Sequence, residues 1–266
     1  MVQVIAHRGA RSLAPENTVK AARIAYDIGA DLWETDVAMT RDRSLILFHD
    51  DTLLRCTDAK KKFPLKASFR VEDFDLDEIR TLDAGSYFVK TDPFAQISQG
   101  NVGGEAQASF IGEPIPLLEE GLILTREKNW KINLELKFFE AGAEDFHLPD
   151  HTLEIIRQTH IPLSRVIISS FHHPWLLRIM EKEPQLEVQA LVGDSDTEPL
   201  DFRDFFFSTY NANAILIHPD QIRALKDRGK KVNLFTVNDP GDFSRFSKLG
   251  VDGIFTDFPQ RFAKKA

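Results

Sequence analysis

Ionisable residues stand at the ends of several short apolar runs in this 266-residue sequence. The segment WETDV places two acidic residues two positions apart, and the segment INLELK places an acid and a lysine at the same spacing. Because residues two apart on a strand face the same side of a sheet, each pair can point into one site. The residues singled out in this way are His7, Arg8, Glu34, Asp36, His49, Glu135 and Lys137.

The three carboxylates of this set indicate a metal site. Glu34, Asp36 and Glu135 would repel one another if they came together without compensation, and the repulsion would raise their pKa values. A divalent cation removes that repulsion, and a set of ligands that are all oxygen atoms favours Mg²⁺ or Ca²⁺ over zinc. We therefore expect one divalent cation, Mg²⁺ or Ca²⁺, as the cofactor.

The other members of the set indicate chemistry on a phosphate ester. The planar guanidinium of Arg8 matches phosphate oxygens, and Lys137 can neutralise a second oxygen or a leaving group. His7 and His49 can supply a base for the attacking oxygen and an acid for the departing one. A metal, two cations for phosphate and two proton carriers together predict hydrolysis of a phosphodiester. Gly9, directly behind Arg8, would let the backbone turn sharply beside the ligand.

Apolar and β-branched runs alternate with helical patterns along the chain, which is typical of parallel βα units. The link Ala38–Ser44 is too short for a parallel crossover, so Leu45–His49 is predicted to return as a hairpin beside the second strand. Eight strands remain, as in a TIM (β/α)8 barrel, whose active sites lie at the carboxyl ends of the strands. The predicted strands are Gln3–His7, Leu32–Val37, Leu45–His49, Ile132–Leu136, Val166–Ser170, Glu187–Val192, Ala214–Ile217, Val232–Val237 and Gly253–Thr256. The predicted helices are Thr18–Ile28, Leu117–Lys128, Thr152–Gln158, Pro174–Lys182, Gln221–Arg228 and Pro240–Leu249.

The stretch from Asp51 to Pro116 is much longer than an ordinary βα connection. It carries one helical pattern, Val71–Leu82, and then the polar tract Gln99–Ser109, which we predict to be mobile. We expect a single domain over residues 1–266, because barrels of about this length often form one domain. Residues 51–116 would be an insertion after the second strand that lies over one end of the barrel.

Composition argues against several classes of protein and partner. A formal net charge of −8 provides no basic face for nucleic acid, and the single cysteine, Cys56, excludes a disulfide framework and a cysteine-rich zinc site. No apolar run approaches the roughly 20 residues that span a bilayer, and the N-terminus lacks the pattern of a signal peptide. We therefore expect a cytoplasmic protein with a small-molecule phosphodiester substrate and without stable membrane insertion. The sequence leaves the oligomeric state open.

One long block, AHRGARSLAPENTVKAARIAYDIGADLWETDVAMTRDRSLILFHDDTLLRCTD, begins the chain, and the blocks IPLLEE, INLELK, VIISSF, NLFTVND and GVDGIFTDFP follow it. In this order the blocks resemble those of the glycerophosphodiester phosphodiesterase family, of the bacterial cytoplasmic type. The resemblance implies a TIM barrel with an inserted segment after the second strand. It also implies release of glycerol 3-phosphate and an alcohol from deacylated phospholipids. By the same resemblance His7 and His49 are the acid–base pair, Arg8 contacts phosphate, Lys137 lies near the substrate, and Glu34, Asp36 and Glu135 bind the metal.

The sequence departs from the family pattern at three places. Phe235 stands where relatives often have Trp, Cys56 stands where they often have Thr, and the tract Gln99–Ser109 is longer than usual. The last two could alter the pocket for the alcohol. Phe171 and Phe235 are predicted to line the substrate pocket, with packing in the core as an equal alternative. Cys56 has no acid–base partner in its motif and is expected to be an inert core residue.

Other polar and aromatic residues receive structural interpretations. Glu16 and Asn17 are predicted to be structural, Asn17 as the cap of a helix, with a functional role as the lesser alternative for both. The segment Asp201–Tyr210 is predicted to be an amphipathic helix of the barrel, with a lipid-facing lip as the alternative. Asp50 and Asp51 are expected to shape a loop, and His172, His173 and His218 to support the site from outside or to face solvent.

Two other functions stay open. The same site with a longer apolar groove would make the protein a lysophospholipase D/C-like phosphodiesterase on lysolipids. A catalytically silent barrel would act as a binding module, although every polar motif residue is present. The nucleophile also stays open, because either water or the glycerol 2-hydroxyl could attack first, and so do the preferred headgroup and the choice between Mg²⁺ and Ca²⁺.

Overall fold

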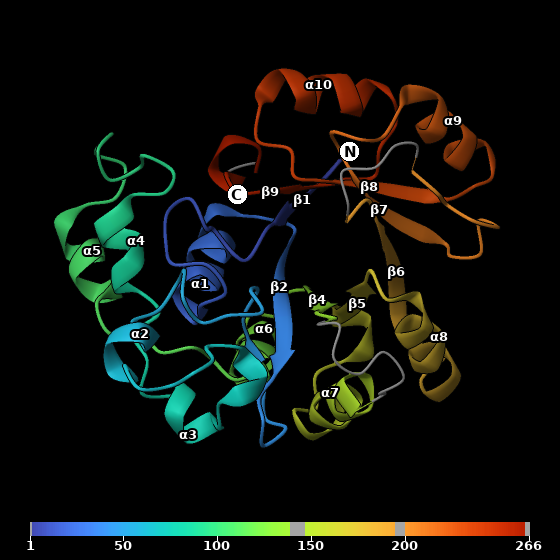
Figure 1. Cartoon of the computed structure of the whole chain (residues 1–266). Coiled ribbons are helices and arrows are strands. Elements are labelled where there is room, and N and C mark those ends of the chain that lie inside the picture. Colours follow the sequence, from blue (N-terminus) through green and yellow to red (C-terminus); the bar gives the residue numbers. More distant parts are fainter. Residues whose placement is uncertain (1, 139–146, 195–199, 264–266) are drawn as a thin grey trace.

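Eight parallel strands close into a barrel in the computed structural model, which describes residues 2–138, 147–194 and 200–263 (Figure 1). The sheet runs in the order β1, β9, β8, β7, β6, β5, β4, β2, and pairing of β1 with β2 closes it. The predicted TIM barrel is therefore confirmed. Its strands are β1 (Gln3–Ala6), β2 (Leu32–Met39), β4 (Ile132–Leu136), β5 (Val166–Ser170), β6 (Glu187–Val192), β7 (Thr209–Asn213), β8 (Lys231–Phe235) and β9 (Gly253–Thr256).

A further strand, β3 (Leu45–Leu47), pairs antiparallel with β2 at the edge of this sheet. Val37 lies opposite Leu47, and the backbone N–H of Phe48 donates to the carbonyl of Asp36 at 3.0 Å. The hairpin predicted from the short link is therefore confirmed. Because the hairpin returns toward Asp36, it brings His49 beside the acidic residues of β2.

The predicted strand Ala214–Ile217 is wrong. The strand is β7, and the apolar residues that suggested it follow the end of β7, with Ile215 86% exposed. β7 carries Asn211 into the barrel interior, where the Oδ1 atom of Asn211 accepts a hydrogen bond from Nδ2 of Asn233 at 2.9 Å. A buried amide interrupts the apolar pattern on which strand prediction depends, so the neighbouring apolar run was the better match.

Helices cover the outside of the barrel (Figure 1), close to the predicted ranges. Their apolar faces pack on the sheet, as Leu118, Leu122 and Ile222 show by being fully buried. The first helix begins after Thr18, whose hydroxyl accepts the backbone N–H of Ala21 at 3.1 Å, so the prediction of Asn17 as the cap is wrong. These helices are α1 (Val19–Ile28), α6 (Leu118–Glu127), α7 (His147–Gln158), α8 (His173–Lys182), α9 (Pro219–Asp227) and α10 (Pro240–Lys248), with short 3-10 turns η2 (Leu163–Arg165) and η3 (Pro259–Arg261).

The segment between β3 and α6 contains more helices than predicted, and in Figure 1 they lie together beside α1. The predicted helix Val71–Leu82 is broken, because Asp75 and Glu78 form a capping box that starts a new helix. The tract Gln99–Ser109, predicted as mobile, passes into a helix whose Phe110 is buried against Phe88. The elements are α2 (Ala59–Lys62), η1 (Val71–Asp73), α3 (Leu76–Ile79), α4 (Ser86–Thr91) and α5 (Gly104–Phe110).

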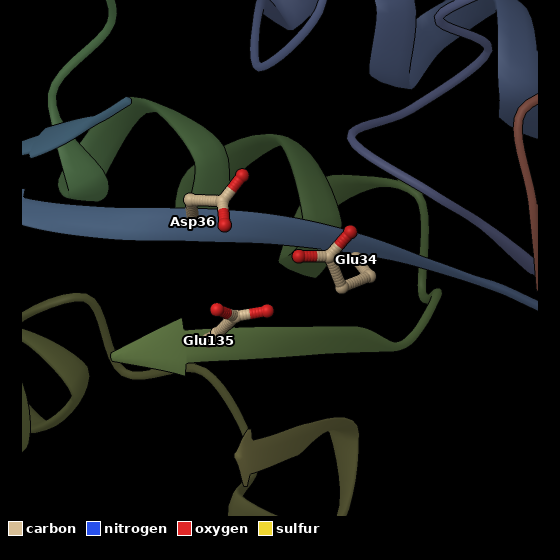
Figure 2. Close-up of side chains that lie close together, drawn as sticks. All are labelled: Glu34, Asp36 and Glu135. Atoms are coloured by element: carbon tan, nitrogen blue, oxygen red, sulfur yellow. The ribbon is translucent and has the colours of Figure 1, made fainter. Parts of the chain in front are cut away.

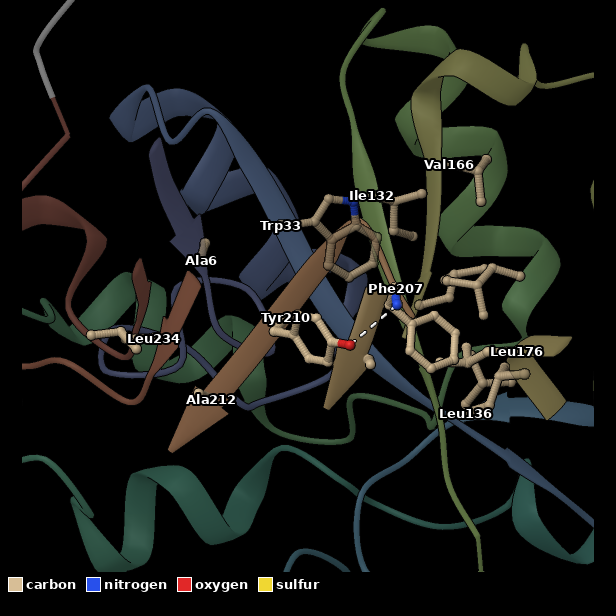
Figure 3. Packing of buried hydrophobic residues seen from close by; sticks show 14 of the residues in the cluster. Ala6, Trp33, Ile132, Leu136, Val166, Leu176, Phe207, Tyr210, Ala212 and Leu234 are labelled. Carbon is tan, nitrogen blue, oxygen red and sulfur yellow. Dashed lines mark hydrogen bonds between the residues drawn. The ribbon is translucent and has the colours of Figure 1, made fainter. Parts of the chain in front are cut away.

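The predicted helix Asp201–Tyr210 is wrong. Residues 200–208 are irregular, and Arg203 and Phe205 have positive φ angles of 51° and 57°, which a right-handed helix does not allow. Tyr210 belongs to β7 and is fully buried, and its hydroxyl accepts the backbone N–H of Phe207 at 3.1 Å (Figure 3). Phe207 packs into the core with Tyr210, whereas Phe206 is 53% exposed. The alternative interpretation of this segment, a lipid-facing lip, stays a prediction.

Gly9 fixes the turn that follows β1. Its φ angle is +77°, and an added Cβ would lie 2.6 Å from the backbone carbon of Ala21 in α1. The turn expected at Gly9 is therefore present, and helix α1 is its close neighbour.

Gly9→Ala is expected to lower the free energy of unfolding by about 1–3 kcal/mol, because alanine would meet both the φ strain and the α1 backbone. Denaturant unfolding measures this effect. The matched control is Gly229→Ala, at φ +69°, where no atom of the described residues lies within 4 Å of the new methyl group, so that this variant meets only the φ strain. Equal losses in the two variants would contradict the steric part of this prediction.

Candidate functional site

The seven polar residues predicted from the strand ends meet at the carboxyl end of the barrel. Parallel pairing of β2 with β4 sets Asp36 opposite Glu135, and His7 directly follows β1. A pocket of about 200 Å³ lies among these side chains. Its lining includes His7, Arg8, Glu34, His49, Glu135, Lys137, Phe171 and Phe235.

Three carboxylates from β2 and β4 face one another (Figure 2). One oxygen atom of each of Glu34, Asp36 and Glu135 lies within 4.8 Å of the other two. Burial, followed by the charges of Asp36 and Glu135, raises the pKa of Glu34 well above its ordinary value. Burial alone would also raise the pKa of Asp36, but the charges of His49, Arg8 and Lys137 lower it. The cluster therefore carries a repulsion that a cation would relieve.

Two oxygens of this cluster are suited to a metal ion. Oε1 of Glu34 and Oδ1 of Asp36 are buried, and neither has a hydrogen-bond partner among the described residues. Buried polar atoms are rarely left in this way, because the cost of removing them from water is not recovered. Carboxylate oxygens are the ligands that hard divalent cations prefer. Glu34, Asp36 and Glu135 thus fit a divalent cation, as the sequence predicted.

Arg8 and Lys137 place positive charge around the carboxylates. Nζ of Lys137 donates to Oε1 of Glu135 at 2.7 Å and lies 3.7 Å from Oδ1 of Asp36. Burial alone would lower the pKa of Lys137, but the charges of Glu135 and Asp36 raise it above its ordinary value. The backbone N–H of Arg8 donates to Glu34 at 2.9 Å, and its guanidinium lies 3.2 Å from Asp36. Both side chains are therefore charged and lie beside the carboxylates that fit a metal ion.

His7 is oriented by a carboxylate that directly follows the last barrel strand. Its Nδ1 atom lies 2.7 Å from Oδ1 of Asp257, and Asn238 donates to Oδ2 of the same carboxylate at 2.7 Å. A carboxylate on Nδ1 favours the tautomer with hydrogen on that atom, so Nε2 is left to exchange a proton in the pocket. Burial, followed by the charge of Arg8, lowers the pKa of His7 below its ordinary value.

His49 has an equivalent partner in its own loop. Nδ1 of His49 lies 2.7 Å from Oδ1 of Asp50, and Nε of Arg55 donates to Oδ2 of Asp50 at 2.7 Å. Asp50 therefore orients the imidazole, a role beyond the loop-shaping one expected from the sequence. Asp51, by contrast, is exposed, and its nearest cation is Arg70 at 3.8 Å.

Asn17 belongs to the site, although the sequence favoured a structural role for it. Its Nδ2 donates to Oδ2 of Asp36 at 2.9 Å, and its Oδ1 accepts the hydroxyl of Thr35 at 2.8 Å. Asn17 also adopts a φ angle of +56°, a conformation that asparagine tolerates better than most residues. Its place before a helix suggested a cap, and no local pattern indicated a contact 19 positions away.

Phe171 and Phe235 both line the pocket, and they also pack on each other. Their ring centroids are 5.9 Å apart in an edge-on arrangement, and Phe235 makes a similar contact with Phe255 at 6.5 Å. The two interpretations of these residues, pocket wall and core packing, therefore both describe part of their surroundings.

The remaining histidines lie outside the pocket. His172 stacks on Phe138 with a centroid distance of 4.3 Å, and Nε2 of His173 lies 3.0 Å from the carbonyl of Leu191. Both line a wider groove of about 750 Å³ that adjoins the pocket. The backbone N–H of His218 donates to Gln221 at the start of α9, away from the pocket lining.

Cys56 is buried beside the first helix of the insertion. Burial, followed by the charge of Glu16, raises the pKa of its thiol to about 12. The thiol is therefore protonated near neutral pH, in agreement with the inert core residue expected from the sequence.

Comparison with known proteins places the chain among phosphodiesterases of one kind. The family model described as "Glycerophosphoryl diester phosphodiesterase family" matches residues 7–261. The chain is 34% identical over 264 residues to the "Glycerophosphodiester phosphodiesterase" of Caldanaerobacter subterraneus, covering 97% of this chain and 94% of that relative. It is 32% identical over 277 residues to the protein of the same description from Bacillus altitudinis, covering 99% of this chain and 98% of that relative.

Solved structures give the same picture. An Oleispira antarctica phosphodiesterase in complex with the product sn-glycerol-3-phosphate superposes with a TM-score of 0.79 at 26% identity, covering 97% of this chain and 94% of that chain. A putative glycerophosphoryl diester phosphodiesterase from Silicibacter pomeroyi gives a TM-score of 0.84 at 26% identity, covering 98% of this chain and 91% of that chain. Both resemblances extend over nearly the whole barrel.

Proposed function

Since the chain belongs to the glycerophosphoryl diester phosphodiesterase family, we propose that it hydrolyses glycerophosphodiesters to glycerol 3-phosphate and an alcohol. The observation that carries this proposal is a cluster of three carboxylates beside a pocket that two cations and two carboxylate-bound histidines line. The product bound to the Oleispira antarctica relative supports the same small-molecule substrate class. Residues 1–266 would act as a single domain, because Arg55 from the insertion reaches the barrel residue Glu16.

The metal ligands in this proposal are Glu34, Asp36 and Glu135. A bound divalent cation, Mg²⁺ or Ca²⁺, would polarise the phosphoryl group and a substrate hydroxyl. Around it, Arg8 and Lys137 would bind the non-bridging phosphate oxygens, because their charges stand on the rim of the carboxylate cluster. Phe171 and Phe235 would form the apolar wall that positions the organic part of the substrate.

The two histidines would move the protons. His7, whose lowered pKa keeps it neutral near pH 7, would take the proton of the attacking hydroxyl at Nε2. His49 would donate a proton to the alcohol oxygen as its bond to phosphorus breaks. The attacking oxygen is either water or the glycerol 2-hydroxyl, and the second case would first give a glycerol cyclic phosphate. Trapping that cyclic phosphate in a single turnover separates the two routes.

The pH dependence of kcat/KM is expected to show an acid limb with its midpoint below pH 6.5. A base works in its neutral form, and burial with the charge of Arg8 lowers the pKa of His7 from its ordinary value of 6.5. The neutral form therefore persists at pH 6.5 and is lost only as pH falls through the lower value. Asp257→Asn removes a carboxylate that raises this pKa, so its acid limb should move further down. A wild-type midpoint above 6.5, at saturating cation, would contradict the role of His7.

The direct test is release of glycerol 3-phosphate from glycerophosphocholine and glycerophosphoethanolamine, with EDTA, Mg²⁺ or Ca²⁺. Release from neither substrate with either metal would favour the alternative substrates, lysophospholipids, which use the same chemistry with a longer apolar chain. None of the helices in residues 2–138, 147–194 and 200–263 has the length and apolar character of a membrane-spanning segment.

A further inference from the structure

Glu16 is a buried carboxylate that meets three arginines. Arg8 donates to its Oε1 at 2.8 Å and Arg11 to its Oε2 at 2.8 Å. Arg55 donates to both oxygens, at 2.7 Å to Oε1 and 3.1 Å to Oε2. The side chain of Glu16 is only 6% exposed and does not line the catalytic pocket, so it cannot touch the substrate there. A buried charge with four charge-assisted hydrogen bonds indicates a role beyond the structural one expected from the sequence.

Two of these arginines also contact the carboxylates that orient the histidines. Arg55 binds Asp50 through Nε at 2.7 Å and Nη2 at 2.8 Å, and Asp50 holds Nδ1 of His49. Nη1 of Arg11 lies 3.5 Å from Oδ1 of Asp257. That oxygen holds Nδ1 of His7 at 2.7 Å. The two histidines come from distant parts of the chain, and Glu16 is the point at which their supporting ion pairs join.

We propose that Glu16 is a positioning residue that orients both His7 and His49, through Arg11 with Asp257 and through Arg55 with Asp50. The inference rests on the proposed acid–base roles of the two histidines. Three guanidinium groups cannot share this small space without an anion between them. Without Glu16, Arg55, whose side chain is 45% exposed, would turn to solvent and release Asp50. Arg11 would then approach Asp257 and compete with His7 for it.

The charge balance supports this arrangement. Glu16, Asp50 and Asp257 supply three negative charges for the three arginines Arg8, Arg11 and Arg55. Burial alone would raise the pKa of Glu16, but the arginines, Arg8 first, lower it well below its ordinary value, so Glu16 stays ionised.

Glu16→Gln, which keeps the shape and removes the charge, tests the proposal. We expect kcat on glycerophosphocholine to fall about 10–100-fold, the usual effect of losing a partner behind a functional residue. KM should rise less than kcat falls, because Arg8 loses Glu16 but keeps Asp36 as a partner. The loss should be smaller on the 4-nitrophenyl ester of glycerol 3-phosphate, because nitrophenolate leaves without a proton from His49. Introduced into a His49→Ala background, Glu16→Gln should add less than its single effect, since part of its action passes through His49. Glu16→Asp, which keeps the charge, should recover part of the activity.

The matched control is Asp150→Asn on the outside of the barrel, where a carboxylate also binds two cations, Arg178 and Lys182. This variant should keep wild-type kcat. If Glu16→Gln does not fold, Arg55→Gln tests the same link at a half-exposed position, with the same expected dependence on the leaving group. Wild-type kcat in Glu16→Gln, or losses that are equal on both substrates and fully additive with His49→Ala, would overturn the inference while leaving the proposed function intact. A wild-type enzyme that releases no glycerol 3-phosphate would overturn both.

Discussion

Replacing His49 by alanine is expected to lower kcat on glycerophosphocholine by about 10²–10⁴-fold, the contribution of a positioned proton carrier. KM should change little, because the imidazole acts on the bond that breaks and Arg8 and Lys137 still bind the phosphate. His49 lines the pocket, and its Nδ1 is held by Asp50 at 2.7 Å, which leaves Nε2 to donate. Steady-state release of glycerol 3-phosphate measures the effect.

The leaving group separates a lost acid from a damaged site. On the 4-nitrophenyl ester, whose leaving group needs no proton, His49→Ala should lose much less activity than on glycerophosphocholine. His151→Ala on the outer helix α7 is the control for removal of an imidazole and should behave as wild type. An equal loss on both substrates would show that His49 is not the acid, and wild-type activity would show that it is not part of the reaction.

Removal of the divalent cation by EDTA is expected to reduce turnover on the order of 10³-fold or more, because metal polarisation of a phosphoryl group contributes several kcal/mol. Mg²⁺ or Ca²⁺ should restore it. Cation binding should also stabilise the fold, by about 2.7 kcal/mol at one hundred times the dissociation constant. The physical reason is that Glu34, Asp36 and Glu135 lie within 4.8 Å of one another and a cation relieves their repulsion. Thermal unfolding in EDTA and in each metal reports this without any substrate.

Asp36→Asn is expected to abolish both effects. The variant removes one ligand charge from the centre of the cluster, so the metal should no longer raise the melting temperature and activity should stay at the EDTA level. Asp150→Asn, a carboxylate outside the barrel, should keep the full response to metal. A melting temperature that rises equally in wild type and Asp36→Asn would place the cation elsewhere, and full activity in EDTA would exclude a role for it.

Most elements of the fold could be predicted from local pattern because the barrel repeats one unit. Parallel strands read as apolar runs and outer helices as amphipathic ones, and the hairpin β3 followed from a link too short to cross the sheet. The prediction errors fall where a polar residue is buried or an apolar residue is exposed. In β7 the buried Asn211 interrupts the apolar pattern by which strands are predicted. Residues 201–208 are rich in phenylalanine but form an irregular segment, in which Phe207 packs inward. The number of helices in the insertion was also underestimated, because several of them are too short to show a helical pattern in the sequence.

Position in the sequence was enough to predict which groups meet at the pocket. His7 directly follows β1 and Glu135 lies at the carboxyl end of β4, and a parallel barrel must bring such ends together, whatever the details of packing. The two-residue spacing of Glu34 and Asp36 likewise sends both to one side of β2. For these residues the local position in a strand is enough to predict the place in space.

The hydrogen bonds that support those groups, by contrast, come largely from residues far apart in the chain. Asp257 meets His7 across 250 positions of the chain, and Arg55 meets Glu16 across 39. Asn17 adopts a positive φ angle, and its side chain donates to Asp36 instead of capping the helix. Such contacts depend on where the ends of loops come to rest, and no periodicity encodes that. Sequence periodicity records which side of a strand a residue faces, whereas hydrogen bonds between loops depend on distances that only the closed barrel sets.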